Sequence, residues 1–212
     1  MPADFDQQSY WRSRFASETA FEWLTPSATF MSLIEPVLRS AVTAPGRTTG
    51  PSILQLGSGT SDLHNHLRAR GYADVTNADY EPLALERGRD MEAREFGDVR
   101  TRYVLADVRQ LRRDLGAAAH RTSSLFDVVV DKGTADAVAC GGTEAVLDMV
   151  RGVRGCLAEG GCWISLSYSS SRFDVPGLPF SVEVIGKIAT PKRTENDPEV
   201  YHWCYLLRPK DL

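Results

Sequence analysis

The stretch that decides the fold is Ser52-Ile53-Leu54-Gln55-Leu56-Gly57-Ser58-Gly59-Thr60-Ser61-Asp62. Its apolar first half is typical of a short buried parallel strand. Its second half is a Gly-x-Gly turn that runs through helix-capping residues into a helical segment over 63–70, which Gly71 ends. A strand, a glycine turn and a helix N-terminus together form a cradle where backbone N–H groups can meet a nucleotide-like ligand.

The position of the glycines separates the ligand classes that use such a cradle. A dinucleotide fingerprint reads G-x-G-x-x-G, and here Asp62 stands where its last glycine belongs. The chain also lacks the G-x-x-x-x-G-K-[S/T] motif of a P-loop. The pattern therefore favours an S-adenosylmethionine (AdoMet) site. A strand-to-helix turn that binds no ligand can show the same Gly-x-Gly pattern, so the assignment of an AdoMet site depends on residues further along the chain.

The composition is that of an ordinary globular α/β domain of 212 residues. A net charge of −4 argues against sequence-independent nucleic-acid binding, and no apolar run is long enough to span a bilayer. Four cysteines without a C-x-x-C pair and four histidines without a zinc pattern predict reduced thiols and no bound metal. We therefore expect a cytoplasmic protein with neither a nucleic-acid nor a membrane partner; its oligomeric state stays open.

Alternating apolar and amphipathic segments predict a parallel sheet with helical crossovers. After the first strand we expect strands near 74–79, 102–106, 126–130 and 162–168, with helices over 27–43, 63–70, 82–96 and 143–157. The segments 180–190 and 199–207 have no helix between them and should pair antiparallel. This predicts a Rossmann-like class I methyltransferase fold: a mostly parallel seven-stranded sheet with a C-terminal antiparallel hairpin. We expect one domain over 1–212, with an N-terminal lid segment (1–45), a loop over 44–51 and an AdoMet-binding core (52–212).

Three aspartates stand at the predicted carboxyl ends of successive strands, where open α/β sheets bind their ligands. Asp79 follows Gly57 by 22 residues (79 − 57), a suitable interval for a carboxylate that accepts both ribose hydroxyls. Asp107 would accept the adenine amine, with the Val108 N–H beside the ring, and Asp131 would face the methionine end and the incoming substrate. Each alone has the ordinary alternative of a loop residue or a helix cap, but the three together indicate a site.

Six aromatic residues crowd positions 5–24, and two interpretations of them stay open. They can pack on the core as part of a helix. They can also form a lid, because aromatic faces attract a sulfonium cation by roughly 0.5–2 kcal/mol and a lid keeps water away from methyl transfer. The six are Phe5, Tyr10, Trp11, Phe15, Phe21 and Trp23.

Several motifs carry a family resemblance. They are Tyr10-Trp11-x-x-Arg14-Phe15, Phe21-Glu22-Trp23-Leu24, the run from Ile53 to Ser61, Asn77-x-Asp79-Tyr80 and Asp127-Val128-Val129-Val130-Asp131-Lys132-Gly133-Thr134. The chain resembles the methyltransferase-like class I (seven-β-strand) protein lysine methyltransferases, which act on translation elongation factor 1-alpha or citrate synthase. The resemblance extends over nearly the whole chain, including the final Tyr201-x-Trp203-x-Tyr205 strand.

The resemblance implies a cofactor, a reaction and a set of residues. The cofactor would be AdoMet, and the substrate a protein lysine. The residues implied around AdoMet are Trp11, Phe15, Phe21, Gly57, Gly59, Asp79, Tyr80, Asp107, Val108 and Asp131. Asp131 would also be catalytic by orienting the amine or accepting its proton through water, whereas Lys132 is expected to be a surface or capping cation.

The chain also departs from the family pattern, and these departures leave the substrate open. Ser58 and Thr60 replace the usual Cys and Asn of the glycine turn, and Ala135 replaces the Leu of the family's Leu-Asp-Ala. Arg172 and Phe173 are expected near the substrate mouth. A small-molecule N- or O-methyltransferase and a non-catalytic AdoMet-binding or scaffold protein are the alternatives, and a dinucleotide oxidoreductase is the least favoured.

Overall fold

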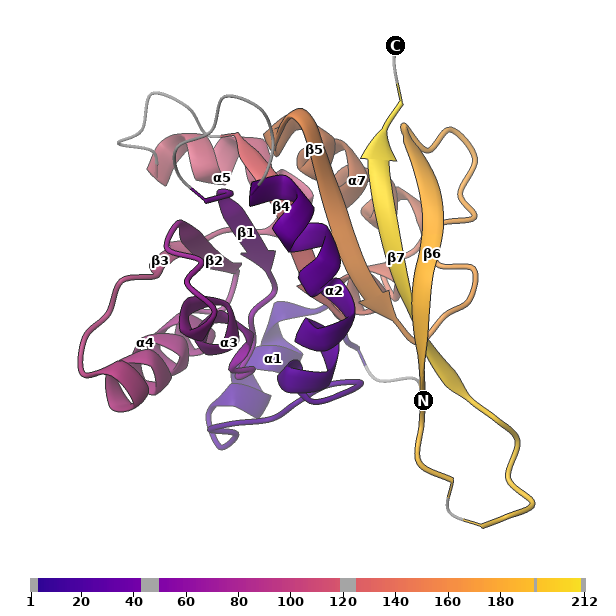
Figure 1. Ribbon diagram of the computed structural model, residues 1–212, viewed down its shortest axis with the longest axis horizontal. Coiled ribbons are helices and arrows are strands. Elements are labelled where there is room, and N and C mark those ends of the chain that lie inside the picture. Colours follow the sequence, from indigo (N-terminus) through magenta and orange to yellow (C-terminus); the bar gives the residue numbers. More distant parts are fainter. Residues whose placement is uncertain (1–3, 43–49, 119–124, 193, 211–212) are drawn as a thin grey trace.

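The computed structural model describes residues 4–42, 50–118, 125–192 and 194–210. They form a seven-stranded sheet in the order β3-β2-β1-β4-β5-β7-β6, flanked by helices (Figure 1). The strands are β1 (Ile53–Leu56), β2 (Val75–Asp79), β3 (Arg102–Leu105), β4 (Phe126–Lys132), β5 (Leu157–Ser167), β6 (Phe180–Ala189) and β7 (Tyr201–Pro209). Strands β1 to β5 pair parallel, whereas β7 pairs antiparallel with both β5 and β6. The predicted fold class is therefore confirmed.

The helices cover both faces of the sheet. They are α1 (Gln8–Phe15), α2 (Ser27–Val42), α3 (Leu63–Ala69), α4 (Pro82–Phe96), α5 (Leu111–Ala118), α6 (Thr134–Ala139) and α7 (Thr143–Cys156), with a 3-10 turn η1 (Val108–Gln110). Helices α2 and α3 contribute to one hydrophobic core and α5, α6 and α7 to the other. Each helix within the described residues is too short or too polar to cross a bilayer.

Strand β4 lies at the centre of the sheet, and its sequence explains why. All seven of its residues are buried. Val128 and Val130 belong to the core beneath α2, and Val129 belongs to the core beneath α7. A strand that is covered on both faces needs a mainly apolar run, which Val128, Val129 and Val130 provide. Asp127 interrupts the run, and its Oδ2 accepts the Ser52 N–H at 2.8 Å.

The structure differs from the predicted elements mainly at short segments. Helices α5 and α6 and the turn η1 are absent from the prediction. Helices this short show few turns of a helical period, and the equally short α3 was found from its capping residues and Gly71. Strand β4 continues to Lys132, and β5 begins at Leu157, inside the predicted helix. Most of the loop expected over 44–51 lies outside the described residues.

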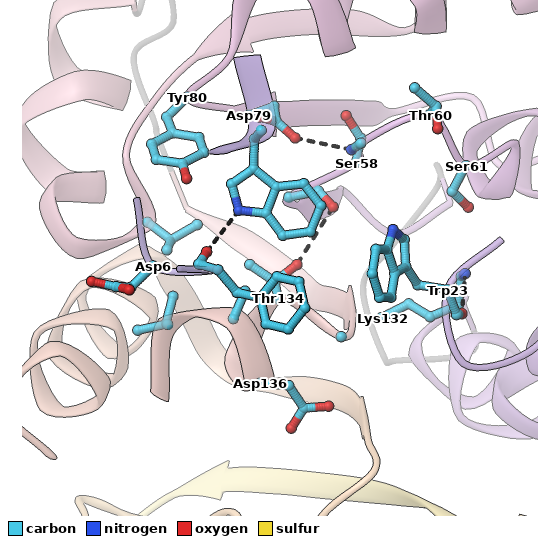
Figure 2. A pocket seen from close by; sticks show the side chains of 18 of the residues that line it. Asp6, Trp23, Ser58, Thr60, Ser61, Asp79, Tyr80, Lys132, Thr134 and Asp136 are labelled. Carbon is cyan, nitrogen blue, oxygen red and sulfur yellow. Dashed lines mark hydrogen bonds between the residues drawn. The ribbon is translucent and has the colours of Figure 1, made fainter. Parts of the chain in front are cut away.

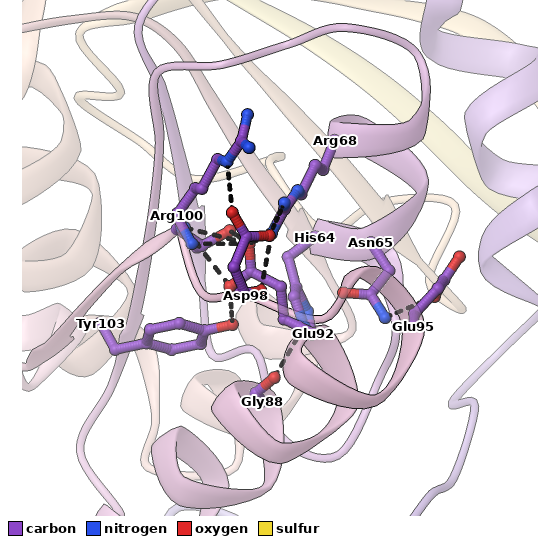
Figure 3. A network of polar contacts seen from close by, with 10 residues as sticks. His64, Asn65, Arg68, Gly88, Glu92, Glu95, Asp98, Arg100 and Tyr103 are labelled. Atoms are coloured by element: carbon purple, nitrogen blue, oxygen red, sulfur yellow. Dashed lines mark hydrogen bonds and ion pairs between the residues drawn. The ribbon is translucent and has the colours of Figure 1, made fainter.

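A buried polar network fixes the edge of the sheet where α3, α4 and β3 meet (Figure 3). Glu92 is fully buried and accepts hydrogen bonds from Arg68 Nη1 (2.7 Å), Thr101 Oγ1 (3.0 Å) and Tyr103 OH (2.9 Å). Burial opposes its ionisation, but the surrounding N–H and O–H donors lower the pKa of the carboxyl. The network ties β3 to α3 and α4, and Asp107 follows the last residue of β3 by two positions.

Candidate functional site

A cavity of about 430 Å³ lies at the carboxyl ends of the parallel strands, beneath the N-terminal segment. Its volume lies in the range of small-molecule sites. Nine of the ten residues predicted around the cofactor line it: Trp11, Phe15, Phe21, Gly57, Gly59, Asp79, Tyr80, Asp107 and Val108. Figure 2 shows Asp79 and Tyr80 on one side, Asp136 on the opposite side, and Thr134 and Trp23 between them.

The glycine turn needs both of its glycines. Gly57 and Gly59 have φ angles of +57° and +51°, a region that other residues rarely adopt. A Cβ at Gly57 would lie 2.3 Å from Thr134 Oγ1, the hydroxyl that starts α6 and donates to the Leu56 carbonyl (2.9 Å). Because Gly57 has no Cβ, α6 can pack directly against the turn. Gly59, also without a Cβ, lies beneath the Phe15 ring.

Asp79 ends β2 with its carboxylate turned toward the glycine turn. Its Oδ2 accepts the Gly59 N–H at 2.9 Å, and its Oδ1 accepts the Glu81 N–H at 2.9 Å (Figure 2). Burial raises the pKa of Asp79 to about 6, although both N–H donors oppose that rise. The structure thus places a buried carboxylate beside the cradle, where hydroxyl groups of a ligand can donate to it.

The next strand end is occupied by Asp107, Val108 and an arginine that the sequence analysis missed. Arg109 Nη2 lies 2.8 Å from Asp107 Oδ2, and its backbone N–H donates to Asp107 Oδ1 at 2.9 Å. Arg109 lines the cavity as well. An aspartate followed two residues later by an arginine is not a distinctive sequence pattern. The two side chains meet because the turn η1 folds Arg109 back onto Asp107.

The N-terminal segment covers the cavity with aromatic side chains. The Trp11 ring centroid lies 5.5 Å from that of Phe15 and 5.7 Å from that of Trp23. Phe15 is almost fully buried, whereas Phe21 is 44% exposed. The same rings therefore pack on one another and line the cavity, and the lid stays a prediction.

An ion pair between a buried lysine and a partly buried glutamate attaches this segment to the sheet. Lys132 Nζ lies 2.8 Å from Glu22 Oε2 and donates to the carbonyl of Trp23 (2.8 Å). The other Glu22 oxygen accepts the Asp62 N–H at the start of α3 (3.1 Å). Burial lowers the pKa of Lys132, and the Lys132 ammonium lowers the pKa of Glu22 against the effect of burial. The expectation of a surface cation is wrong, because β4 carries Lys132 into the space between the sheet and residues 22–25.

The position predicted for Asp131 is also wrong. Its side chain is fully buried and does not line the cavity. Oδ2 accepts the indole N–H of Trp163 at 2.7 Å, Oδ1 accepts the Ala135 N–H at 3.1 Å, and burial raises the pKa of the carboxyl to about 6. Since β4 extends two residues further than predicted, Asp131 keeps the strand alternation and points with Val129 into the core beneath α7.

The two residues expected near the substrate mouth have different surroundings. Phe173 is 4% exposed and packs on Trp163 with ring centroids 5.0 Å apart, so it belongs to the core. Arg172 instead pairs with Asp136, whose Oδ1 lies 2.8 Å from Arg172 Nε. Asp136 and Tyr168 line the cavity, and the sequence analysis assigned a role to neither. The available signal was the position of Asp136, which directly follows Ala135 and stands where the family has the Asp of its Leu-Asp-Ala.

Comparisons with known proteins place the chain in a family. No protein-family profile matches it. Methyltransferase srdJ of Neurospora crassa is 53% identical over 207 residues, which is 98% of this chain and 85% of srdJ. EEF1A lysine methyltransferase 4 of Mus musculus is 29% identical over 184 residues, covering 81% of this chain and 64% of the mouse protein. The chain therefore belongs to the methyltransferase family that includes srdJ, and it resembles the EEF1A lysine methyltransferases more distantly.

Solved structures agree on the fold. The N-methyltransferase NodS of Bradyrhizobium japonicum, in complex with S-adenosyl-L-homocysteine, superposes with a TM-score of 0.64 at 13% identity and covers 95% of this chain and 99% of NodS. TrmN of Thermus thermophilus has a TM-score of 0.64 at 18% identity and covers 94% of this chain and 53% of TrmN. These likenesses support the class I methyltransferase fold.

The family supports the predicted cofactor, AdoMet, and the cavity fits it. Asp79 offers a carboxylate for hydroxyl donors, and the aromatic rings suit a sulfonium. Three buried polar atoms of lining residues have no hydrogen-bond partner within the described chain, namely Trp23 Nε1, Gln55 Oε1 and Ser58 Oγ. Buried polar atoms normally have a hydrogen-bond partner, so these three unpaired atoms indicate that the cavity binds a polar ligand. No group of three His, Cys, Asp or Glu side chains among the described residues is arranged to hold a metal.

Proposed function

We propose that this protein uses AdoMet to methylate a lysine of a protein substrate related to translation elongation factors. The observation that carries the proposal is the joining of the glycine turn, Asp79 and the N-terminal aromatic rings in one cavity. The 29% identity to an EEF1A lysine methyltransferase over 184 residues supports the choice of lysine.

We assign the predicted cofactor residues to the following roles. Asp79 accepts the ribose hydroxyls, and the glycine turn lets the backbone approach the ligand closely. The Asp107 carboxylate and the Val108 N–H meet the adenine edge, with Arg109 holding the carboxylate in place. The aromatic residues Trp11, Phe15, Phe21 and Tyr80 cover the ligand and keep water out. Asp131 has no part in this list, because it lies outside the cavity.

Methyl transfer to an amine sets clear demands on the protein. Bound AdoMet would supply an activated methyl group: the amine nitrogen would form the N–C bond as the S–C bond breaks, sulfur would keep the electron pair, and the proton lost by the methylated amine would pass to water. The acceptor amine must be neutral and aligned, so the protein contributes mainly by positioning and by excluding water. A lid held by the Glu22–Lys132 pair would serve this purpose. We take residues 1–212 as one domain in which 1–45 form the lid, and the cytoplasmic location stays a prediction.

A second candidate is methyl transfer to a small molecule. It is favoured by one observation: the relative at 53% identity is named only as a methyltransferase, whereas the lysine methyltransferases are at 29%. Because one fold hosts many acceptors, the fold does not choose between the two. A non-catalytic AdoMet-binding protein is the candidate from another functional class, and it predicts cofactor binding without methyl transfer.

One experiment separates the three candidates. Purified protein and AdoMet carrying a labelled methyl group are added to a cell extract that has been divided into protein and small-molecule fractions. Label on a discrete protein band, released as methyl-lysine on hydrolysis and absent with Asp79→Asn, supports the proposal. Label confined to the small-molecule fraction overturns it in favour of the second candidate. AdoMet binding with no label in either fraction favours the binding protein.

A further inference from the structure

A second polar cluster lies on the side of the cavity opposite Asp79, and none of the assigned roles uses it (Figure 2). Asp136, in the first turn of α6, lines the cavity with only 8% of its surface exposed. Tyr168 follows directly after β5, lines the same cavity and is 57% exposed. A nearly buried carboxylate beside an exposed aromatic ring marks the point where the cavity meets solvent.

The Asp136 carboxylate is held rigidly. Its Oδ1 accepts from Ser167 Oγ at 2.5 Å and from Arg172 Nε at 2.8 Å, and its Oδ2 accepts the Tyr168 N–H at 3.0 Å. The Arg172 side chain is 12% exposed, and its guanidinium carbon lies 5.4 Å from the centre of the Tyr168 ring. The Asp136 carboxylate therefore holds three groups in place: the end of β5 at Ser167, the Tyr168 backbone and the Arg172 side chain.

Building on the proposed function, we propose that Asp136 accepts a hydrogen bond from the amine of the acceptor lysine, and that Tyr168 packs against the methylene chain of that lysine. A carboxylate oxygen has room for more than one donor, so Oδ2 can accept an amine N–H in addition to the Tyr168 N–H. A lysine stem is apolar and packs well along an aromatic ring while its amine reaches inward.

Arg172 has a separate role in this arrangement, as a positioning residue. A carboxylate alone would stabilise the lysine in its ammonium form, which cannot accept a methyl group. The guanidinium beside Asp136 offsets that charge, so the amine can lose its proton more easily. Asp136 would then orient the nitrogen without keeping it protonated.

The groups around Asp136 leave Arg172 as its cationic partner. Lys132 is paired with Glu22, and burial lowers the pKa of His202, which favours a neutral imidazole. Among the described residues, other titratable groups that interact electrostatically with Asp136 are Asp131 in β4, Cys140 at the end of α6 and Tyr205 in β7, and none of these three is a cation.

The test compares Asp136→Asn, Arg172→Gln and Tyr168→Ala with the wild-type protein, using the lysine substrate found by labelling. Asp174→Asn is the matched control, because Asp174 is an exposed carboxylate two residues after Arg172. AdoMet affinity is measured by calorimetry for each variant, and kcat and KM are measured across pH. Thermal unfolding identifies any variant that has lost its fold.

We expect Asp136→Asn to bind AdoMet within about twofold of wild type and to lose about 100-fold in kcat, which is the scale of a misplaced reacting group. Tyr168→Ala should raise KM about fivefold, since the exposed ring can be removed without disturbing the core. Arg172→Gln should move the rising limb of the kcat profile to higher pH, because the unpaired carboxylate retains the ammonium form. Arg172→Lys should restore the wild-type profile in part, and Asp174→Asn should behave as wild type.

The two proposals fail in different ways. If the wild-type protein methylates no lysine, the proposed function fails and this site falls with it. If the wild-type protein methylates lysine but Asp136→Asn retains its kcat, or loses AdoMet binding in proportion to activity, only the acceptor site is overturned. An unshifted pH profile in Arg172→Gln overturns the role of Arg172. Should Asp136→Asn fail to fold, an unchanged KM in Tyr168→Ala overturns the site.

Discussion

Replacement of Asp79 by Asn tests the cofactor site most directly, because it changes one buried oxygen to an amide of nearly the same shape. Asp79 Oδ2 accepts the Gly59 N–H at 2.9 Å and Oδ1 accepts the Glu81 N–H at 2.9 Å. The amide retains one acceptor and loses the negative charge. The backbone bonds of the turn are thus half preserved, whereas a ligand hydroxyl loses its charged partner.

The expected loss of binding follows from that charge. Hydrogen bonds to an ionised group contribute about 1.5–3 kcal/mol, which corresponds to about 10- to 100-fold in affinity. We therefore expect Asp79→Asn to weaken AdoMet binding by about 10- to 100-fold. Because burial raises the pKa of Asp79 to about 6, wild-type affinity should also fall as pH drops below 6, and the variant should lack that dependence.

Asp79→Asn should weaken AdoMet binding, but it should make the ligand-free protein less sensitive to rising pH. The folded-state pKa of Asp79 is raised from 3.8 to about 6, so the folded state binds a proton that the unfolded state has released between those values. Stability from this group is present below about pH 4 and is lost as pH rises through 6, by about 3 kcal/mol in total. We expect the ligand-free Asn variant to lose less stability over this window than the wild type.

Asp131→Asn is the matched control for both measurements. Asp131 is also fully buried with a pKa raised to about 6, but it lies outside the cavity. Urea unfolding between pH 4 and 8 should show altered pH dependence for both variants, and calorimetry with AdoMet should show weakened binding for Asp79→Asn alone. Wild-type affinity in Asp79→Asn, or equal loss in both variants, would refute the assignment of the ribose to Asp79.

Three further substitutions test the lid and the core. Lys132→Met leaves the partly buried Glu22 without its cation and should lower the free energy of unfolding by roughly 1–3 kcal/mol, measured by urea denaturation. Trp163→Phe removes the donor to Asp131 Oδ2 and should cost about 1–3 kcal/mol of stability while calorimetry shows unchanged AdoMet affinity. Trp11→Ala should weaken AdoMet binding by about tenfold if its ring covers the ligand, and unchanged affinity with a lowered Tm would show that Trp11 serves packing alone.

Exposed or partly exposed residues provide the controls for the first two of these. Lys187→Met removes an exposed lysine that lies over the Tyr201 ring at 3.9 Å, and it should change stability by less than about 1 kcal/mol. Trp203→Phe changes a half-buried indole on β7 and should cost less than Trp163→Phe. A loss in either control equal to that of its partner would contradict the reasoning.

The fold could be predicted because its signals are local. Strands β1 and β4 appear as short apolar runs, and α4 begins at Pro82 and is closed by Gly97 in the left-handed conformation, as the capping rules require. Helix α6 has six residues and its placement depends on the Thr134 hydroxyl bond to Leu56. That bond joins residues 78 positions apart, so no local pattern could reveal it.

The site could be predicted up to the ends of the strands and no further. Asp79 and Asp107 lie where their strands end, and both line the cavity. Asp131 was assigned by the same rule, but β4 continues two residues past Val130, and each added residue exchanges the face to which a side chain points. An error of one or two residues in the predicted end of a strand is therefore enough to mistake a core residue for a cavity residue. The pairing of Lys132 with Glu22 spans 110 positions (132 − 22) and has no sequence signal.

The departures from the family's glycine turn have a structural consequence that connects the lid to the cradle. Thr60, which replaces the usual Asn, donates its hydroxyl to Glu18 Oε1 at 2.8 Å, and its carbonyl accepts the Phe21 N–H at 3.3 Å. Arg14 holds the other Glu18 oxygen at 2.6 Å and lies over the rings of Phe21 and Trp23. The N-terminal segment is therefore bonded to the turn on which the cofactor is proposed to bind. If this segment acts as the proposed lid, its opening must break these contacts together.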